Sequence, residues 1–275
     1  MLLREVEYAK PGSVAEALEL LASNDGARAL AGGQTLINVM KARAASPDML
    51  VDLNGLEELR GIELAGDGTL TIGAMTTYSE LMASAEAKAR PILGEVCATI
   101  ADVQVRNRGT IGGNLCSNDP TNHLPPLMAA VGARMTIAGA GGEREVPAEE
   151  FFLGVYLTAV GPGELLTRIT VPPGRRDGFA AVTIGRDGTC IVSAAASLNG
   201  GARVAIGCVD AVPVRAGAME ERIGADFSDE SVRAAADGLG ATLDPPADVH
   251  ASADYRRRLA EVLAARAVIA ARERR

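Results

Sequence analysis

Two glycine pairs, each followed by polar residues, are the part of this sequence best suited to bind a ligand. The first lies in Ala31-Gly32-Gly33-Gln34-Thr35 and the second in Thr110-Ile111-Gly112-Gly113-Asn114. Glycine pairs turn the chain, and they also let backbone N–H groups approach a bound anion closely. One such pair alone favours a structural turn. The two together, with hydroxyl and amide side chains beside both, favour an anion site and a structural role about equally.

The binding hypothesis assigns specific donors to each motif. Amide donors are expected around Gly33 and from Gly112 and Gly113, and side-chain donors from Gln34, Thr35, Thr110 and Asn114. Two such turns brought together would cradle a pyrophosphate without a cationic side chain. A valine at Gly112 should then reduce binding severely and leave much of the secondary structure intact, because a turn at the site lies outside the core.

The common nucleotide-binding patterns are absent from the sequence. Neither G-x-G-x-x-G between a strand and a helix nor G-x-x-x-x-G-K-[ST] occurs. The nearest approach, at 138–143, lies between two strand-like runs and predicts a hairpin turn. A nucleotide would therefore have to bind through the two separate glycine motifs.

Composition and charge narrow the class of protein. The 275 residues are 48% hydrophobic and 23% charged, as is typical of a globular domain. With 27 Lys and Arg against 35 Asp and Glu, the net charge of -8 disfavours binding to nucleic acid or anionic membranes. No signal peptide or apolar run of transmembrane length is present, so we expect a cytoplasmic protein without membrane insertion.

The cysteines give no sign of a metal site. Cys97, Cys116, Cys190 and Cys208 are widely spaced, with no C-x-x-C pair and no histidine at metal-ligand spacing. We therefore expect no bound metal and four buried free thiols.

Secondary-structure signals before residue 56 place the first glycine pair between a strand and a helix. Ser13 and Glu16 form a capping-box pattern at the start of a helix. A strand within 27–31, a second helix beginning at Leu36 and a strand at 49–53 are expected to follow. The order is helix, strand, glycine turn, helix, strand.

The middle of the chain predicts a mixed α+β unit. A hairpin over 61–74 is centred on Asp67-Gly68, and helices are expected within 77–98. The second glycine pair follows in a polar stretch that ends in a short helix, before strands at 134–139 and 164–172.

The segment 171–178, rich in proline, glycine and charge, predicts a domain boundary. Beyond it, 179–185, 189–198 and 202–209 have the spacing of an antiparallel meander. Two helical segments are expected to close the chain, the last with one apolar face formed by Leu259, Val262, Leu263 and Ile269.

The order of these motifs resembles a known family. "AGGQTL", "VDL", "VRNRGTIGGNLCSNDP", "GPGELLTRITVP" and "VHASADYRRRLA" together are similar to the FAD-binding medium subunit of molybdenum hydroxylases, which include aerobic carbon monoxide dehydrogenase and xanthine dehydrogenase. The resemblance implies an α+β chain: a two-subdomain FAD-binding fold of the vanillyl-alcohol oxidase type, then a domain with a small antiparallel sheet and helices. The expected divisions are 1–55, 56–174 and 175–275.

The resemblance also implies which residues contact FAD. Those around the pyrophosphate and ribityl chain would be Ala31, Gly32, Gly33, Gln34, Thr35, Leu36, Thr110, Ile111, Gly112, Gly113 and Asn114. Ile100 and Ala101 would lie near the FAD, and Asp119 in the polar loop after the second motif. Leu165 and Leu166 would fall where the family packs an apolar side chain near the isoalloxazine ring.

This sequence departs from the family pattern at two places. His123 stands where many relatives have an aspartate near the adenosine ribose, so it either contacts the ribose or is a surface loop residue. The family also tends to have Lys or Arg near the start of the last sheet, whereas the segment 180–188 of this chain keeps only Arg186.

By resemblance, this chain is an oxidoreductase subunit that contributes no catalytic side chain. Electrons would leave the substrate at a molybdopterin cofactor in a large partner, pass through [2Fe-2S] clusters in a small partner, and reach this chain's FAD and then an external acceptor. The implied assembly is a dimer of heterotrimers. The alternatives are a free-standing FAD-dependent oxidoreductase and a non-catalytic scaffold whose glycine pairs are only turns.

Overall fold

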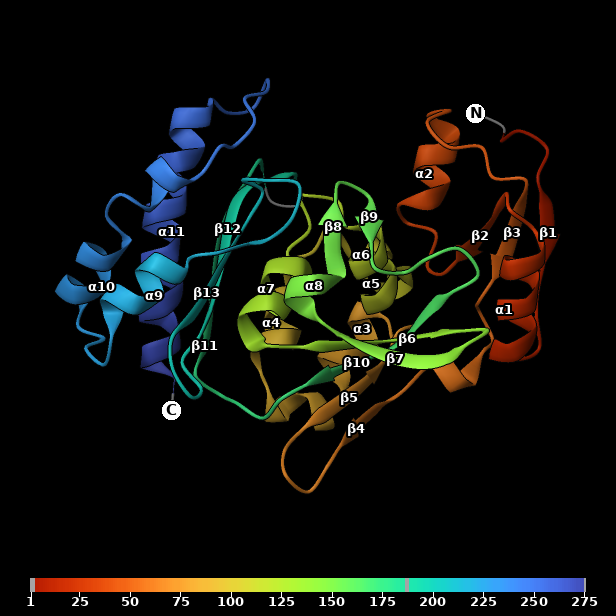
Figure 1. Cartoon of the computed structure of the whole chain (residues 1–275), viewed down its shortest axis with the longest axis horizontal. Helices are drawn as coiled ribbons and strands as arrows, with labels where there is room; N and C mark the ends of the chain where they lie inside the picture. Colours follow the sequence, from red (N-terminus) through yellow and green to blue (C-terminus); the bar gives the residue numbers. More distant parts are fainter. Residues whose placement is uncertain (1–2, 186–187, 275) are drawn as a thin grey trace.

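The computed structural model describes residues 3–185 and 188–274, in which three main sheets follow one another along the chain (Figure 1). The first is a parallel sheet of order β1-β3-β2, built from β1 (Glu7–Ala9), β2 (Ala27–Leu30) and β3 (Met49–Asp52). It is accompanied by α1 (Val14–Ser23) and α2 (Leu36–Lys41). This order of elements confirms the one predicted from the sequence.

The start of α1 shows how closely the local sequence sets the structure. The Ser13 hydroxyl accepts the Glu16 N–H at 3.2 Å, as expected of a helix-capping serine. The Glu16 carboxylate accepts the N–H of Gly12 at 2.7 Å, one residue before the partner that a capping box uses.

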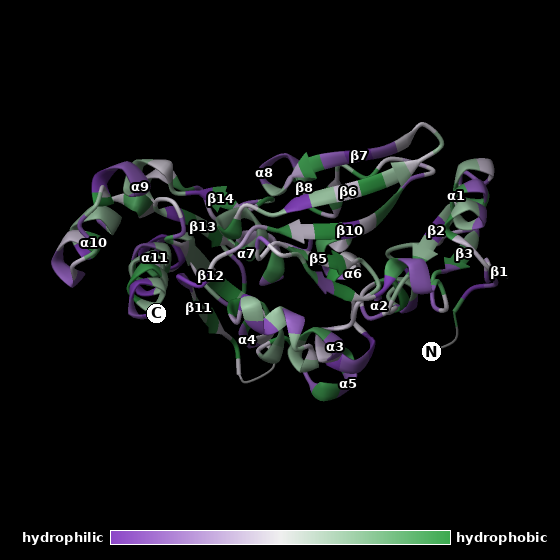
Figure 2. Cartoon of the chain, turned by 90° about the horizontal axis from the view of Figure 1, so that it is seen from below, coloured by the Kyte–Doolittle hydropathy of each residue, from purple (hydrophilic) through white to green (hydrophobic). Residues whose placement is uncertain are grey.

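The second sheet is antiparallel, with the order β4-β5-β10-β6-β7. Its strands are β4 (Ile62–Leu64), β5 (Leu70–Gly73), β6 (Arg134–Gly139), β7 (Gly142–Pro147) and β10 (Leu165–Val171). The chain between β5 and β6 forms α3 (Tyr78–Ala83), α4 (Ile92–Ala98), α5 (Val103–Arg108), α6 (Ile111–Ser117) and α7 (Leu124–Val131). Helices α3, α4 and α5 lie together on one side of this sheet (Figure 2). Both predicted hairpins are confirmed.

The third sheet is the predicted antiparallel meander with one added strand. It consists of β11 (Asp177–Thr183), β12 (Cys190–Ser197), β13 (Arg203–Gly207) and β14 (Val214–Arg215). The closing helices are more numerous than the sequence suggested: α9 (Gly217–Ile223), α10 (Asp229–Ala236) and α11 (Ala253–Glu273). Among the described helices, none is long and apolar enough to cross a membrane.

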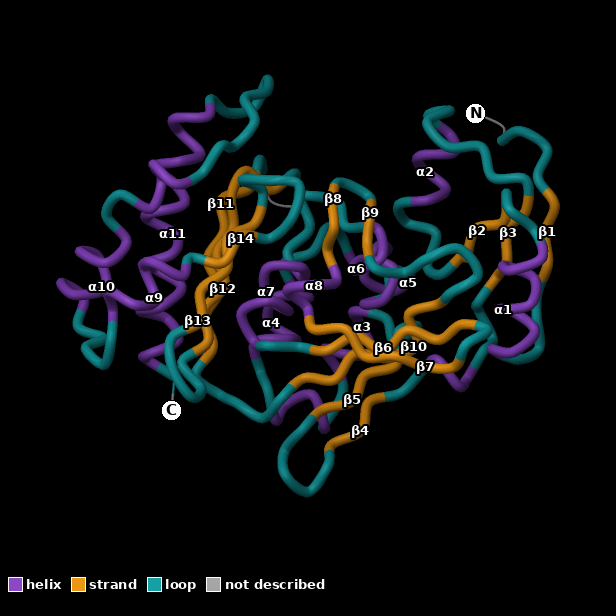
Figure 3. Tube along the Cα trace, in the orientation of Figure 1, coloured by secondary structure: helices purple, strands orange, loops and turns teal. Residues whose placement is uncertain are grey.

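The third sheet is covered on both faces. Helix α11 runs alongside β11, β12 and β13 (Figure 3). The α11 backbone lies very close to β11: a Cβ placed on Gly178 of β11 would lie 2.0 Å from the carbonyl oxygen of Ala267 in α11. Helix α7 of the second unit packs on the opposite face, because Ala195 and Ala205 share a hydrophobic cluster with Leu127. The small side chains of this sheet allow both helices to approach.

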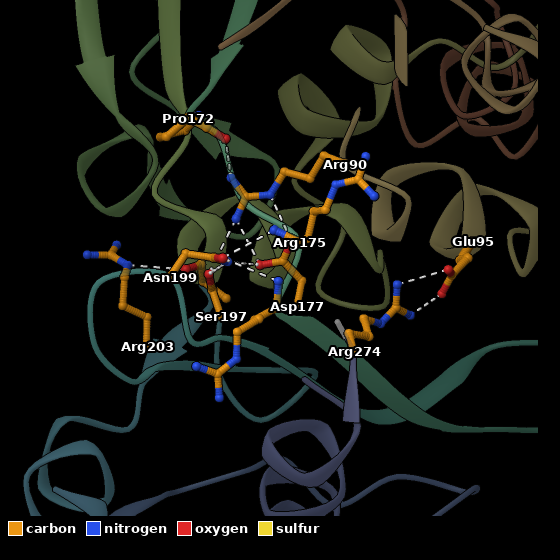
Figure 4. A network of polar contacts seen from close by, with 11 residues as sticks. Arg90, Glu95, Pro172, Arg175, Asp177, Ser197, Asn199, Arg203 and Arg274 are labelled. Carbon is orange, nitrogen blue, oxygen red and sulfur yellow. Dashed lines mark hydrogen bonds and ion pairs between the residues drawn. The ribbon is translucent and has the colours of Figure 1, made fainter. Parts of the chain in front are cut away.

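A buried ion pair ties the second unit to the third (Figure 4). Arg90 donates through Nε and Nη2 to the two carboxylate oxygens of Asp177, both at 2.8 Å, and these residues are 2% and 0% exposed. The Asn199 amide also donates to Asp177, at 2.9 Å, and Arg90 donates to the Pro172 carbonyl. The network therefore fixes the chain on both sides of the Pro- and Gly-rich connection.

We expect Arg90→Ala to lower the free energy of unfolding by about 3–5 kcal/mol, because it leaves the buried Asp177 carboxylate without a counter-charge. The matched control is Arg233→Ala, since Arg233 and its partner Asp229 have side chains 71% and 52% exposed. That control should cost at most about 1 kcal/mol. Urea unfolding of both variants tests this, and equal losses would contradict it.

Candidate functional site

The fold brings the two glycine motifs into direct contact, as the sequence hypothesis requires. Gly32, which follows β2, lies against the end of α5: a Cβ placed on it would be 2.0 Å from the Arg108 carbonyl oxygen. A Cβ on Gly113 would lie 3.6 Å from the Ala31 side chain. Segments far apart in the sequence therefore meet at a point where one of them must be glycine.

The first motif presents unpaired backbone donors. Gly33 has a left-handed backbone with φ of +73°, and a left-handed residue in such a turn directs successive N–H groups toward one point. Within the described residues, none of the amides from Gly32 to Leu36 forms a hydrogen bond. Amides left unpaired in this way favour an anionic ligand or water as their partner.

Side chains next to the first motif hold its carbonyls. Gln34 donates to the Gly32 carbonyl at 3.1 Å, and Asn54 donates to the Ala31 carbonyl at 3.0 Å. The carbonyls of Ala31 and Gly32 thus have partners, whereas the N–H groups from Gly32 to Leu36 have none within the described residues. The Gln34 side chain therefore has a structural role in the turn, and its contact with a ligand stays a prediction.

Asn54 is itself positioned by the end of β3. Asp52 accepts the backbone N–H of Asn54 at 2.9 Å and its side-chain amide at 2.7 Å, and also accepts the Tyr8 hydroxyl. Burial raises the pKa of Asp52, but the hydrogen bonds from Tyr8 and Asn54 outweigh it and hold that pKa below its ordinary value. An ionised Asp52 therefore positions Asn54, which in turn holds the Ala31 carbonyl of the first motif. This role of Asp52 was missed in the sequence.

The second motif differs from its expected form. Thr110 caps α6, so Gly112 and Gly113 lie in the first turn of a helix and not in a loop. The Gly112 N–H donates to the Ala74 carbonyl at 2.9 Å and the Gly113 N–H to the Thr110 hydroxyl at 3.0 Å. The expectation that these amides are ligand donors is wrong, because helix capping and the end of β5 already occupy them.

Gly112 also belongs to the packed interior. A Cβ on it would lie 2.6 Å from the Ala74 carbonyl oxygen and 2.7 Å from the Ala74 Cβ. Replacing it by valine would therefore disturb the packing of α6 against the end of β5, contrary to the expectation of an intact fold. The side-chain oxygen Oδ1 of Asn114 is buried and has no hydrogen-bond partner among the described residues.

Ile100 and Ala101 lie in a strained loop immediately before α5. Ala101 has φ of +42°, which is uncommon for a residue with a Cβ. The Arg106 guanidinium holds this conformation by donating to the carbonyls of Ile100 and Ala101 at 2.9 and 2.5 Å. Arg106 was missed in the sequence, where an arginine in a short helix carries no specific signal.

The loop after α6 is ordered by its own side chains. Asp119 accepts the N–H and hydroxyl of Thr121 at 2.9 and 2.7 Å, and its other oxygen accepts the Tyr156 hydroxyl at 2.9 Å. Its carboxylate is thus held in place within the loop that the sequence singled out.

His123 is not a surface loop residue. It is 7% exposed, its Nδ1 lies 3.2 Å from the Thr99 hydroxyl, and its ring centroid lies 5.2 Å from that of Phe179. The surface interpretation is wrong because β11 of the third unit covers the loop. Its contact with a ribose stays a prediction.

Leu165 and Leu166 are both buried but face opposite sides of β10. Leu165 packs in a cluster with Val51 and Met75, whereas Leu166 packs with Met135 and the helices of the second unit. Only one of them can therefore line a given pocket. Arg186 lies outside the described residues.

Comparison with known proteins gives the family. Residues 4–174 match the model described as "FAD binding domain in molybdopterin dehydrogenase", and 175–271 match "CO dehydrogenase flavoprotein C-terminal domain". The chain belongs to the FAD-binding medium subunits of molybdenum hydroxylases. It is an oxidoreductase component.

Individual members of this medium-subunit family are similar over their whole length. The carbon monoxide dehydrogenase medium chain of Hydrogenophaga pseudoflava is 38% identical over 283 residues, covering 98% of both chains. The glyceraldehyde dehydrogenase medium chain of Sulfolobus acidocaldarius is 36% identical and covers 96% of this chain and 97% of its own. Among solved structures, quinoline 2-oxidoreductase from Pseudomonas putida 86 superposes with a TM-score of 0.94 at 33% identity, covering 99% of both chains.

We expect Gly32→Ala to lower the amount of FAD that co-purifies with this medium subunit several-fold, because its Cβ would push the two motifs apart. Overpacking of this kind costs about 1–3 kcal/mol of unfolding free energy. The control is Gly141→Ala, where a Cβ would meet nothing within 4 Å. Flavin absorbance per protein measures the effect, and equal flavin content in the two variants would show that the contact is irrelevant to binding.

Proposed function

We propose that this medium subunit holds one non-covalent FAD where its two glycine motifs meet. The observation that carries the proposal is the set of unpaired amides from Gly32 to Leu36, placed against the second motif. Backbone N–H groups converging from a left-handed turn suit a pyrophosphate. The divisions 1–55, 56–174 and 175–275 are inferred as the corresponding domains, with the cofactor between the first two.

The roles of the predicted site residues follow from what each can offer. The amides of Gly32, Gly33, Gln34, Thr35 and Leu36 would take the pyrophosphate, with the Thr35 hydroxyl beside them. Ala31, Thr110, Ile111, Gly112 and Gly113 would form the wall that brings the motifs together, and Asn114 would supply an acceptor. Ile100, Ala101, Asp119 and His123 would border the cofactor, with one of Leu165 and Leu166 against its ring.

The bound flavin would supply redox chemistry, by which electrons from [2Fe-2S] clusters of a small partner reach an external acceptor. The residues of this chain bind and orient it and exclude water around it. We infer a large molybdopterin-containing partner as the site of substrate oxidation, and assembly as a dimer of heterotrimers. The related chains named as medium subunits support a multi-subunit complex. Free thiols among the described residues support a cytoplasmic location.

FAD binding is tested on the purified full chain. Acid denaturation should release about one free FAD per chain, because the cofactor would be held only by non-covalent contacts that unfolding removes. The released flavin is measured by absorbance and chromatography. Flavin that remains with the precipitated protein would contradict the non-covalent site, and a colourless protein would favour the scaffold alternative.

The electron-transfer role is tested by comparing the single chain with its complex. The chain alone should not oxidise an N-heterocycle, an aldehyde or carbon monoxide with a dye acceptor. Co-expressed with the proteins encoded beside it, it should purify with a [2Fe-2S] subunit and a larger molybdenum subunit. Substrate turnover by that complex should be lost when FAD is stripped and molybdenum and iron remain. Turnover by the single chain would instead favour a free-standing flavoprotein.

A further inference from the structure

Two cysteines and a histidine meet at the junction of the second and third units, outside the proposed roles of the glycine motifs. Cys190 is the first residue of β12 and Cys208 directly follows β13; they are 2% and 5% exposed, and both are free thiols. His123, at the start of α7, lies next to Cys190. Two separate backbone irregularities create this arrangement.

The first irregularity is a β-bulge next to Cys190. Val182 of β11 pairs with Val192, and the next residue, Thr183, pairs with Cys190, so Ile191 is the extra residue. Val192 and Ile191 both pack in the cluster on the α11 side of the sheet. Regular alternation from Val192 would direct Cys190 to that side also, but the bulge reverses it and turns Cys190 toward α7.

The second irregularity is the backbone of Cys208, which has φ of +67°. Gly207 faces α7, since a Cβ on it would lie 2.8 Å from the Pro126 side chain. Alternation would turn the next residue to the α11 side, yet Cys208 lines a small crevice on the α7 side together with Pro125 and Pro126. A left-handed conformation at a residue with a Cβ is costly, and such strain is concentrated at functional sites.

Arg256 of α11 forms hydrogen bonds with the backbone at both irregularities, from the α11 side of the sheet. This arginine is 4% exposed, and its Nη1 donates to the carbonyls of Ile191 and Cys208 at 2.5 and 3.3 Å. One guanidinium thus holds the bulge and the left-handed residue close together.

The contacts between these side chains favour a thiolate on Cys190. The neighbouring Cys208 thiol, together with His123, holds the pKa of Cys190 below that of an ordinary thiol, although burial opposes this. The neighbouring Cys190, together with burial, raises the pKa of Cys208. A reactive thiolate beside a protonated thiol is the arrangement found in redox-active cysteine pairs.

We propose that Cys190 and Cys208 are a reversible redox pair that hydrogen peroxide oxidises to a disulfide. The Cys190 thiolate attacks one peroxide oxygen and the O–O bond breaks, which gives a sulfenic acid on Cys190 and hydroxide. The Cys208 sulfur then displaces the sulfenic oxygen, which leaves as water with the Cys208 proton. Overall, two thiols and one peroxide give one disulfide and two waters, and a dithiol reductant reverses the step.

Cys97 and Cys116 serve as internal controls. Burial raises the pKa of each to about 12, so neither is expected to supply a thiolate at neutral pH. Peroxide oxidation should therefore discriminate between the two pairs of cysteines within one molecule.

The experiment treats the full, FAD-containing chain with hydrogen peroxide, then alkylates it under denaturing conditions and maps its peptides by mass spectrometry. We expect a disulfide between Cys190 and Cys208 that dithiothreitol removes, with Cys97 and Cys116 still alkylated. In Cys208→Ser, a sulfenic acid on Cys190 should be trapped by dimedone, whereas Cys97→Ser should still form the disulfide.

A further variant separates the role of His123 from simple proximity of the thiols. His123→Gln should form the same disulfide about tenfold more slowly, because less of Cys190 is then thiolate. Its flavin content is measured in parallel, so that a defect in FAD binding is distinguished from a defect in thiol reactivity. Peroxide that leaves Cys190 and Cys208 as thiols, or that oxidises all four cysteines at equal rates, would overturn the proposal.

Discussion

The contact of Gly32 with the Arg108 carbonyl is the constraint on which the cofactor site depends. It leaves no room for a side chain, so the parallel three-stranded sheet and the helices of the second unit meet backbone to backbone. Around it, the carbonyls of the first motif are held by Gln34 and Asn54, and Asn54 is held by Asp52. The conformation of the first motif therefore depends on Asp52 at the end of β3.

The two glycine motifs contribute in different ways despite their similar sequences. The first leaves its N–H groups unpaired, whereas the second uses them for the cap of α6 and the end of β5. Each residue has one backbone N–H donor, so an N–H that is hydrogen-bonded within the fold is rarely free to bind a ligand as well. The first motif is accordingly the donor surface and the second the support that positions it.

The sequence predicted most of the elements because their signals are local. The capping serine of α1, the turn at Asp67-Gly68 and the alternation of the meander each depend on a few neighbouring residues. The polar character of both glycine motifs made their meeting at one site one of two equal alternatives. What could not be predicted depends on distant packing: the helical start at Gly112 is completed by Ala74, and Phe179 buries His123. Arg106, Asn54 and the thiol pair likewise acquire their roles only through partners that the linear sequence does not place beside them.

The buried pair of Arg90 and Asp177 has a consequence for how this subunit moves. Separating these groups would expose or isolate charges that are almost fully buried, which is energetically costly. A second pair, Arg274 with Glu95 of α4, joins the same two units (Figure 4). The third unit should therefore move with the second as one rigid body. A movement that admits a cofactor would then occur on the other side of the molecule, where the parallel sheet meets the helices of the second unit through Gly32.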